Sequence, residues 1–287
     1  MIDLALSVLS STLIFVAFKL FDVYKVQTLY AIITNYVVAC LVGLFLYEGN
    51  VDVTELTTTS WYWGPIALGV LFITIFNLMA KSTQVSGVTV TSVATKMSLV
   101  IPVVVGVLIY KEELSLLQIV GIVLALLAVY LSSQKEKGIT INQKDLLLPL
   151  LVFLGSGIID TSIKYFEEKH LTDQEIPIFS SMVFGCAALT GLVFIGIKSF
   201  KTPLKVNFRN ILGGIALGVP NYFSIFFLIR ALRSDMLNSA AVFTLNNVAI
   251  VMLSTILGIL LFKERLRPKN WGGVALAVLS IILVALF

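Results

Sequence analysis

Long apolar runs alternate with short polar connections along the whole chain. Runs such as residues 116–131 and 271–287 are continuously apolar and lack the period-two alternation of a membrane β-strand. A helix that crosses a bilayer needs about 20 mainly apolar residues. The pattern predicts ten such helices, near residues 2–20, 28–47, 61–80, 87–110, 115–133, 146–166, 176–198, 209–230, 236–262 and 270–287.

The composition supports this interpretation. The chain has 287 residues, of which 58% are hydrophobic and 13% are charged. A soluble domain carries about 25% charged residues, so this chain could not cover its own surface with charge in water. A soluble enzyme, a secreted disulfide scaffold, a disordered segment and a nucleic-acid binder are therefore excluded. The sequence predicts an all-α integral membrane protein, with the lipid bilayer as its surroundings.

An internal repeat divides the chain into two halves. Residues 9–21 resemble 154–166 at an offset of 145, residues 66–70 recur as 215–219 at an offset of 149, and Lys111–Leu114 returns as Lys263–Leu266 at an offset of 152. We expect a first five-helix half at 1–133, a linker at 134–145 and a second five-helix half at 146–287. Because five is odd, the second half must enter the membrane in the opposite sense. Inverted repeats of this kind are typical of secondary transporters.

These features resemble a known family. Each half has a Lys-Glu-x-Leu turn between its fourth and fifth helices and a Gly-x-x-x-Ala pattern in its fifth, at Gly121 and Ala125 and again at Gly273 and Ala277. Together they are similar to the EamA family of the drug/metabolite transporter superfamily. The resemblance implies a ten-helix carrier of the bacterial inner membrane, often a metabolite exporter. It also implies a central cavity lined mainly by the first, third, fourth, sixth, eighth and ninth helices.

Three features have simple structural interpretations. Small residues four apart let membrane helices approach closely, so we expect the two Gly-x-x-x-Ala patterns to pack the scaffold. The Lys-Glu-x-Leu turns are expected to be solvated helix ends, with a coupling role at a gate as the alternative. His170, the one histidine, follows charged residues and is expected to be solvated.

The distribution of basic residues predicts the orientation. The odd-numbered connections carry fourteen lysines and arginines and the even-numbered connections carry five. Basic residues favour the cytoplasmic side, so both termini are expected outside the cytoplasm. Members of the resembled family are often thought to have cytoplasmic termini, so this expectation departs from the resemblance. The net charge of +4 is ordinary for a membrane protein.

Lys96 is the foremost candidate for substrate binding. It lies near the middle of its predicted helix, where a charge costs about 2.5–3.5 kcal/mol on insertion scales. Thr89, Ser92 and Lys96 follow helical spacing and form one polar stripe. The equivalent place in the second half carries Asn246 and Asn247. Two polar sites in repeat-related helices predict a shared aqueous cavity, whereas the alternative is a structural lysine bonded to carbonyls or to a buried acid.

Three further polar residues are candidate binding residues. Asp160 either pairs with Lys164 one helical turn away or faces the cavity, where it would bind an ammonium group or carry a proton. Asn77 and Asn221 either face the cavity or bond a neighbouring helix, and Pro220 is expected to bend the helix beside Asn221. Asn35 is a weaker candidate of the same kind.

Catalytic, cofactor and metal motifs are absent from the sequence. There is no G-x-x-x-x-G-K-[ST] phosphate loop, no H-E-x-x-H and no G-x-S-x-G, so we expect no enzymatic activity, no cofactor and no metal. The two cysteines, Cys40 and Cys186, lie inside apolar runs and predict no disulfide framework.

The leading hypothesis is a secondary transporter that exports a small polar metabolite by alternating access. Lys96 would bind a carboxylate, and Asp160 the amino group of an amino-acid-like substrate. Protons are the candidate coupling ion. A non-transporting assembly protein on the same fold would instead close its cavity with apolar side chains. A lipid-linked carrier flippase would need a lateral opening, which a sequence cannot show.

Overall fold

The computed structural model describes residues 1–46, 57–110, 115–133, 143–172, 175–200, 207–232 and 239–286, and every regular element in these residues is a helix. The helices are α1 (Ile2–Val23), α2 (Thr28–Phe45), α4 (Gly64–Ser86), α5 (Val88–Met97), α6 (Val100–Tyr110), α7 (Leu116–Ser132), α8 (Gln143–Lys169), α9 (Ile176–Ser199), α10 (Phe208–Leu232), α11 (Ser239–Phe262) and α12 (Pro268–Leu286).

The ten predicted segments are confirmed as helices. Within the described residues, eight spans are long and apolar enough to cross a membrane, and two shorter apolar helices cover Leu116–Ser132 and Pro268–Val284. The fourth predicted segment is broken into α5 and α6, which the hydropathy pattern did not predict. A backbone in lipid must satisfy its own hydrogen bonds, which explains why the apolar runs are all helical.

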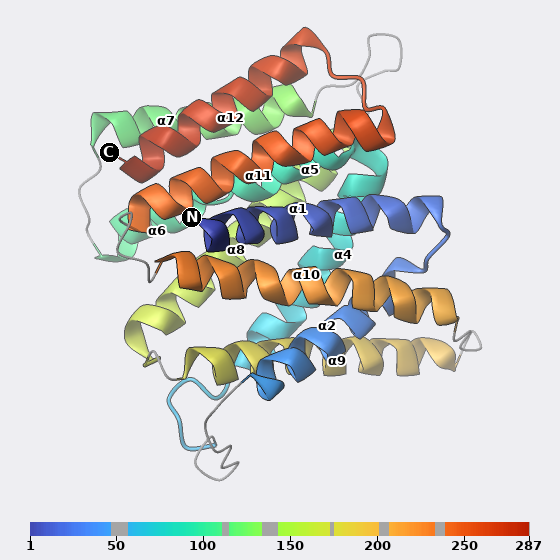
Figure 1. Ribbon diagram of the computed structural model, residues 1–287. Helices are drawn as coiled ribbons and strands as arrows, with labels where there is room; N and C mark the ends of the chain where they lie inside the picture. Colours follow the sequence, from blue (N-terminus) through green and yellow to red (C-terminus); the bar gives the residue numbers. More distant parts are fainter. Residues whose placement is uncertain are drawn as a thin grey trace.

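The helices run back and forth between two ends of one bundle (Figure 1). Both termini lie at the same end, on the left in Figure 1, and we call it the terminal end. The opposite end, where α1, α4 and α11 finish and α5 begins, is the far end. Helices α7 and α12 lie side by side at one edge of the bundle.

Glycine contacts hold α7 against α12. A Cβ added to Gly121 would lie 2.7 Å from Cγ2 of Val284, and one added to Gly273 would lie 2.6 Å from the backbone N of Ser132. Ser280 Oγ donates a 2.7 Å hydrogen bond to the carbonyl of Gly121. The predicted packing role of the two glycine patterns is therefore confirmed.

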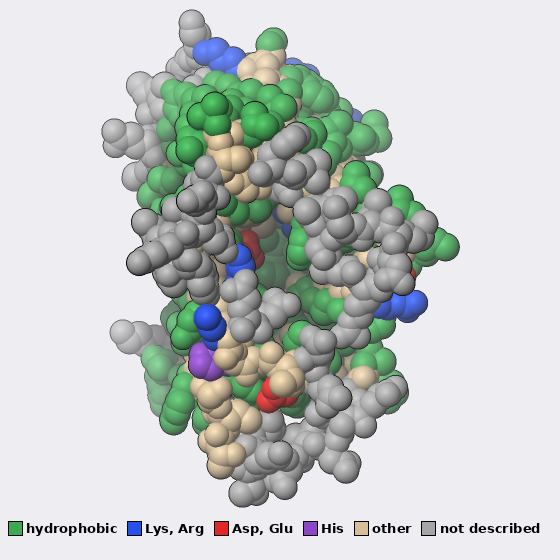
Figure 2. Space-filling view, turned by 90° about the vertical axis from the view of Figure 1, so that its left-hand side faces the viewer, with side chains coloured by type: hydrophobic (Ala, Val, Ile, Leu, Met, Phe, Trp, Pro, Cys, Tyr) green, Lys and Arg blue, Asp and Glu red, His purple; other side chains and the backbone are tan. Residues whose placement is uncertain are grey.

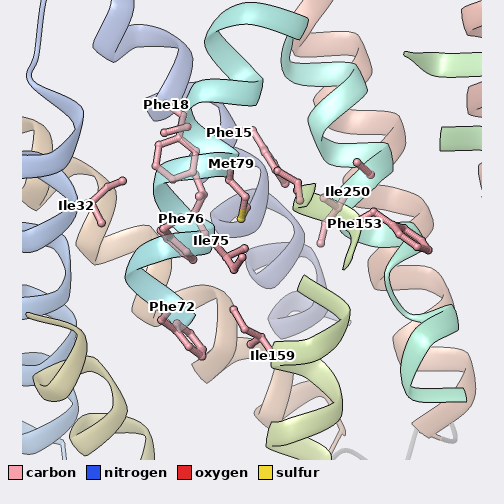
Figure 3. Packing of buried hydrophobic residues seen from close by; sticks show 14 of the residues in the cluster. Phe15, Phe18, Ile32, Phe72, Ile75, Phe76, Met79, Phe153, Ile159 and Ile250 are labelled. Atoms are coloured by element: carbon pink, nitrogen blue, oxygen red, sulfur yellow. The ribbon is translucent and has the colours of Figure 1, made fainter. Parts of the chain in front are cut away.

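An aromatic and aliphatic core joins α1, α4 and α8 in the middle of the bundle (Figure 3). Phe18 of α1 meets Phe76 of α4 edge to face, with ring centroids 5.7 Å apart. Gly155 and Gly157 leave no room for a side chain beneath Ile75 of α4 and Ile101 of α6. These close contacts set the position of α8, and with it the position of Asp160.

Candidate functional site: a broken helix facing an acidic residue

The break between α5 and α6 has a local cause at Pro102. Proline has no N–H, and its ring clashes with the carbonyl four residues earlier, which here belongs to Ser98. That carbonyl instead accepts a tighter hydrogen bond from the N–H of Ile101 at 2.9 Å. Ser98 Oγ also bonds the carbonyl of Thr95 at 2.6 Å. The helix therefore stops at Met97 and starts again at Val100, directly beside Lys96.

Asp160 faces this break from α8. Ser98 Oγ donates a 3.1 Å hydrogen bond to Oδ2 of Asp160, and the charges of Asp160 and Lys96 interact electrostatically. Among the described residues, the two groups do not form a direct ion pair. Asp160 therefore has a hydrogen-bond partner at the break between α5 and α6, outside its own helix. The structure thus places Lys96 and Asp160 close enough for their charges to interact, and Ser98 donates a hydrogen bond to Asp160.

The face of the molecule at the terminal end has a hollow near its centre (Figure 2). Acidic and basic side-chain atoms are visible inside the hollow. Asp160 is exposed and Lys96 half-buried, although both belong to candidate membrane spans, Leu146–Phe166 and Val88–Gly106. A carboxylate inside a membrane span needs water or a polar partner, and the Ser98 hydroxyl is one such partner of Asp160.

Ser92 and Thr89 point to a different place from Lys96. Ser92 Oγ accepts a 2.6 Å hydrogen bond from Ser254 Oγ of α11, and both side chains are fully buried. Thr89 lies one turn nearer the far end and bonds Glu264 at 2.9 Å through its hydroxyl. The polar stripe predicted along this helix therefore divides: Lys96 lies beside Asp160, and the other two residues join α5 to α11.

Asn246 and Asn247 of α11 also have different surroundings. Ser7 Oγ lies 3.2 Å from Oδ1 of Asn246 and donates a 2.8 Å bond to the carbonyl of Ser224, so Asn246 belongs to a buried contact among α1, α10 and α11. Asn247 is half-buried. Of the two, only Asn247 keeps surface that a ligand could reach.

The remaining predicted asparagines bond within or between neighbouring helices. Asn77 Nδ2 donates 2.7 Å to the carbonyl of Ile73 on its own helix. Asn221 Nδ2 donates 3.2 Å to Oδ1 of Asn35, and both residues are buried. The Asn35–Asn221 pair links α2 to α10 and does not lie with Lys96 and Asp160 in any described contact.

Sequence reasoning missed Glu264 and Ser98. The second Lys-Glu-x-Leu turn is not simply a solvated helix end: the Glu264 carboxylate accepts bonds from the N–H groups of Val88 and Thr89 at the start of α5, at 2.5 and 3.2 Å. The prediction for this turn was wrong because a helix N-terminus from the other half binds its acid. The first such turn, at 111–114, lies outside the described residues. Pro102, four residues after Ser98, was the sequence signal that could have predicted the helix break at Ser98.

His170 makes its contacts at the exposed surface of the terminal end. The ring is half-buried, its Nδ1 lies 3.0 Å from Ser60 Oγ, and it packs on Tyr165. Beside it, Trp61 Nε1 donates 2.9 Å to Oε1 of Glu175. These contacts tie the segment before α4 to the α8–α9 turn at the terminal end. No group of three potential metal-ligating side chains occurs in the described ranges.

Comparisons with known proteins agree with this architecture. A sequence model of the EamA-like transporter family matches residues 2–134. An uncharacterized protein of Haemophilus influenzae is 30% identical over 285 residues, which is 97% of this chain and 96% of that protein. A crystal structure with 16% sequence identity has a TM-score of 0.58 and covers 98% of this chain and 97% of its own, so it shares the fold. The chain is a multi-pass membrane protein that belongs to the EamA-like transporter family.

Proposed function

We propose that this protein is a secondary transporter that exports a small polar, amino-acid-like metabolite by alternating access. The observation that carries the proposal is the helix break at Ser98, flanked by Lys96 and faced by Asp160, inside a bundle whose terminal end is hollow. Transporters commonly bind substrate where a membrane helix is interrupted near the midplane. Lys96 would hold the substrate carboxylate and Asp160 its ammonium group.

A zwitterionic substrate suits this pair of charges. In the empty protein Lys96 and Asp160 partly compensate each other's charge. An isolated charge inside a membrane is costly unless it is paired and hydrogen-bonded. A substrate with both charges replaces this interaction with two contacts of its own, whereas a simple anion leaves the Asp160 charge without a compensating positive charge. Asp160 is also the group that would carry a proton if transport is coupled to one.

Alternating access would use two inverted halves, 1–133 and 146–287. Equivalent cross-half contacts at opposite ends of the bundle support this arrangement. At the far end, Asn210 of the second half bonds Gln27 of the first at 2.9 and 3.0 Å. At the terminal end, Trp61 of the first half bonds Glu175 of the second. Trp61 lies 149 positions before Asn210, and Glu175 lies 148 positions after Gln27, so the two contacts correspond under the repeat. Helices α7 and α12, which carry the repeat-related glycines Gly121 and Gly273, also pack against each other across the two halves.

The location follows from the charge distribution. We infer a bacterial inner membrane with both termini outside the cytoplasm, because the basic connections lie at the far end. The hollow at the terminal end would then face outward. An assembly protein without transport activity would have its lysine inaccessible among apolar side chains, and the exposure of Asp160 beside Lys96 favours the transporter.

The test is flux in proteoliposomes with radiolabelled amino acids and organic acids. We expect at least one amino acid to be transported, and Lys96→Ala to lower that flux by about tenfold or more, since a charge-assisted contact is lost. Lys81→Ala is the matched control, because Lys81 is exposed at the far end of α4. No flux for any compound with correctly folded protein, or equal effects of the two substitutions, would contradict the proposal.

A further inference from the structure

Glu264 joins the two halves at the far end. It lies between α11 and α12, where Lys263 turns the chain with a φ of 54°. Its carboxylate accepts hydrogen bonds from the N–H groups of Val88 and Thr89 and from the hydroxyl of Thr89. The first N–H groups of a helix have no partner within the helix and carry partial positive charge, so a carboxylate is well suited to bind them.

A glycine on each half, Gly87 before α5 and Gly258 on α11, leaves room for the Glu264 carboxylate. Gly87 precedes α5 with a φ of 102°, and a Cβ there would lie 2.8 Å from Oε1 of Glu264. A Cβ on Gly258 of α11 would lie 2.6 Å from Oε2. Any larger residue at either position would have to displace the carboxylate.

A second contact between the same helices lies one turn deeper. Ser254 Oγ donates a 2.6 Å bond to Ser92 Oγ, and both residues are fully buried. Together with the Glu264 contact, it joins α5 to the end of α11 near the far end. The hollow, in contrast, opens at the terminal end.

We propose that Glu264 is a gate residue whose carboxylate holds the far end closed and must release α5 before that end can open. This inference rests on the proposed transport function, because rocking of one half against the other would separate α5 from α11. Glu112, which the repeat relates to Glu264, lies outside the described residues.

The test measures closure directly and does not depend on transport. Cys40 and Cys186 are replaced by serine, Ser92 and Ser254 by cysteine, and a protease site is placed in the linker between the halves. Oxidation with copper phenanthroline cross-links the halves when the far end is closed, and cleavage then shows the joined halves on a non-reducing gel. The cross-linking rate is compared among variants of equal monodispersity in reconstituted vesicles.

We expect Glu264→Ala to slow cross-linking by about tenfold, the effect of losing a charge-assisted bond at a helix N-terminus. Gly258→Ala should do the same by displacing the carboxylate, and Glu264→Gln should have a smaller effect. Arg265→Ala, at an exposed position of the same turn, is the matched control and should not change the rate.

An unchanged rate in Glu264→Gln and Gly258→Ala would overturn the gate, even if Glu264→Ala fails to fold. Failure of the transport function would instead be seen as absent flux with the wild-type protein, whatever the cross-linking rates are.

Discussion

Ser98 donates a hydrogen bond to Asp160 across the boundary between the two halves of the chain, with 3.1 Å between Oγ and Oδ2. The donor stands at the break in a membrane helix and the acceptor is an exposed acid inside a membrane span. This bond holds the carboxylate at the break, and its charge interacts with that of Lys96. The first prediction concerns the charge of that carboxylate.

Asp160→Asn should separate zwitterions from simple anions. The amide keeps an oxygen that accepts the Ser98 bond but loses the charge that would hold a substrate ammonium group. We expect the inhibition constant of a transported amino acid to rise about tenfold or more, and that of its deaminated analogue to stay the same. Competition assays in proteoliposomes measure both, with Asp22→Asn on the exposed surface as control. Equal changes for the two compounds would remove Asp160 from ammonium binding.

Pro102→Ala should straighten the helix and impair transport. Alanine supplies the N–H that can bond the Ser98 carbonyl, so the backbone gains a helical hydrogen bond. We expect an unchanged or higher melting temperature together with a lower rate of flux, because Lys96 and Ser98 are moved away from Asp160. Pro65→Ala is the control, since Pro65 lies in the first turn of α4, where proline is tolerated. Wild-type flux in Pro102→Ala would show that the break is not needed.

Gly273→Ala and Gly272→Ala form a matched pair that tests helix packing. A Cβ at Gly273 would meet the backbone of Ser132 at 2.6 Å, whereas a Cβ at Gly272 has nothing within 4 Å. We expect the first substitution to lower the free energy of unfolding by about 1–3 kcal/mol through overpacking. The second should be neutral or stabilising by up to about 1 kcal/mol from helix propensity. Unfolding in detergent measures both, and similar values would refute the close approach of α7 and α12.

Glu175 should make stability depend on pH. Burial raises the pKa of Glu175, but hydrogen bonds from Thr172 and Trp61 outweigh that effect and hold its pKa below the ordinary value of 4.5. The charged form is therefore favoured in the folded protein. Its contribution is fully present above the ordinary pKa and is lost as the pH falls through the lowered pKa.

The measurement is thermal unfolding in detergent between about pH 3 and pH 7, a range that brackets carboxyl titration. Glu175→Gln should lower the melting temperature at neutral pH and should reduce the loss of stability on acidification. Asp22→Asn, at a surface site, serves as the control. Parallel pH curves for wild type and Glu175→Gln would contradict this role.

The orientation is tested with fusions at the C-terminus. Because the basic connections lie at the far end, the terminal end is expected outside the cytoplasm. Alkaline phosphatase fused after Phe287 should therefore be active, and green fluorescent protein at the same position should be dark. The opposite pair of results would place the termini in the cytoplasm and the hollow on the cytoplasmic side.

The local features of the fold could be predicted because they depend on short stretches of chain. Each apolar run is long enough to span lipid and must satisfy its own backbone, so runs such as Ile2–Val23 and Ile176–Ser199 are helices wherever they lie. The packing role of Gly121 and Gly273 was also predictable, since small residues four apart have few other uses in a membrane helix. Pro102 was the sequence signal for the break at Ser98, but the hydropathy pattern does not detect a break inside a continuous apolar run.

The sequence by itself determined the ten helices, the family and the short set of polar residues whose presence in a membrane helix is costly and therefore calls for a structural or functional role. Only the tertiary structure decided which of those residues meet. Asp160 contacts Ser98 and lies near Lys96, whereas Asn221 bonds Asn35 and Ser92 bonds Ser254. The physical reason is that a helix forms from interactions within a few residues, while the direction of each polar side chain depends on how the helices rotate and pack against one another. Glu264 shows this most clearly, because the helix N-terminus it binds lies 176 residues away in the sequence.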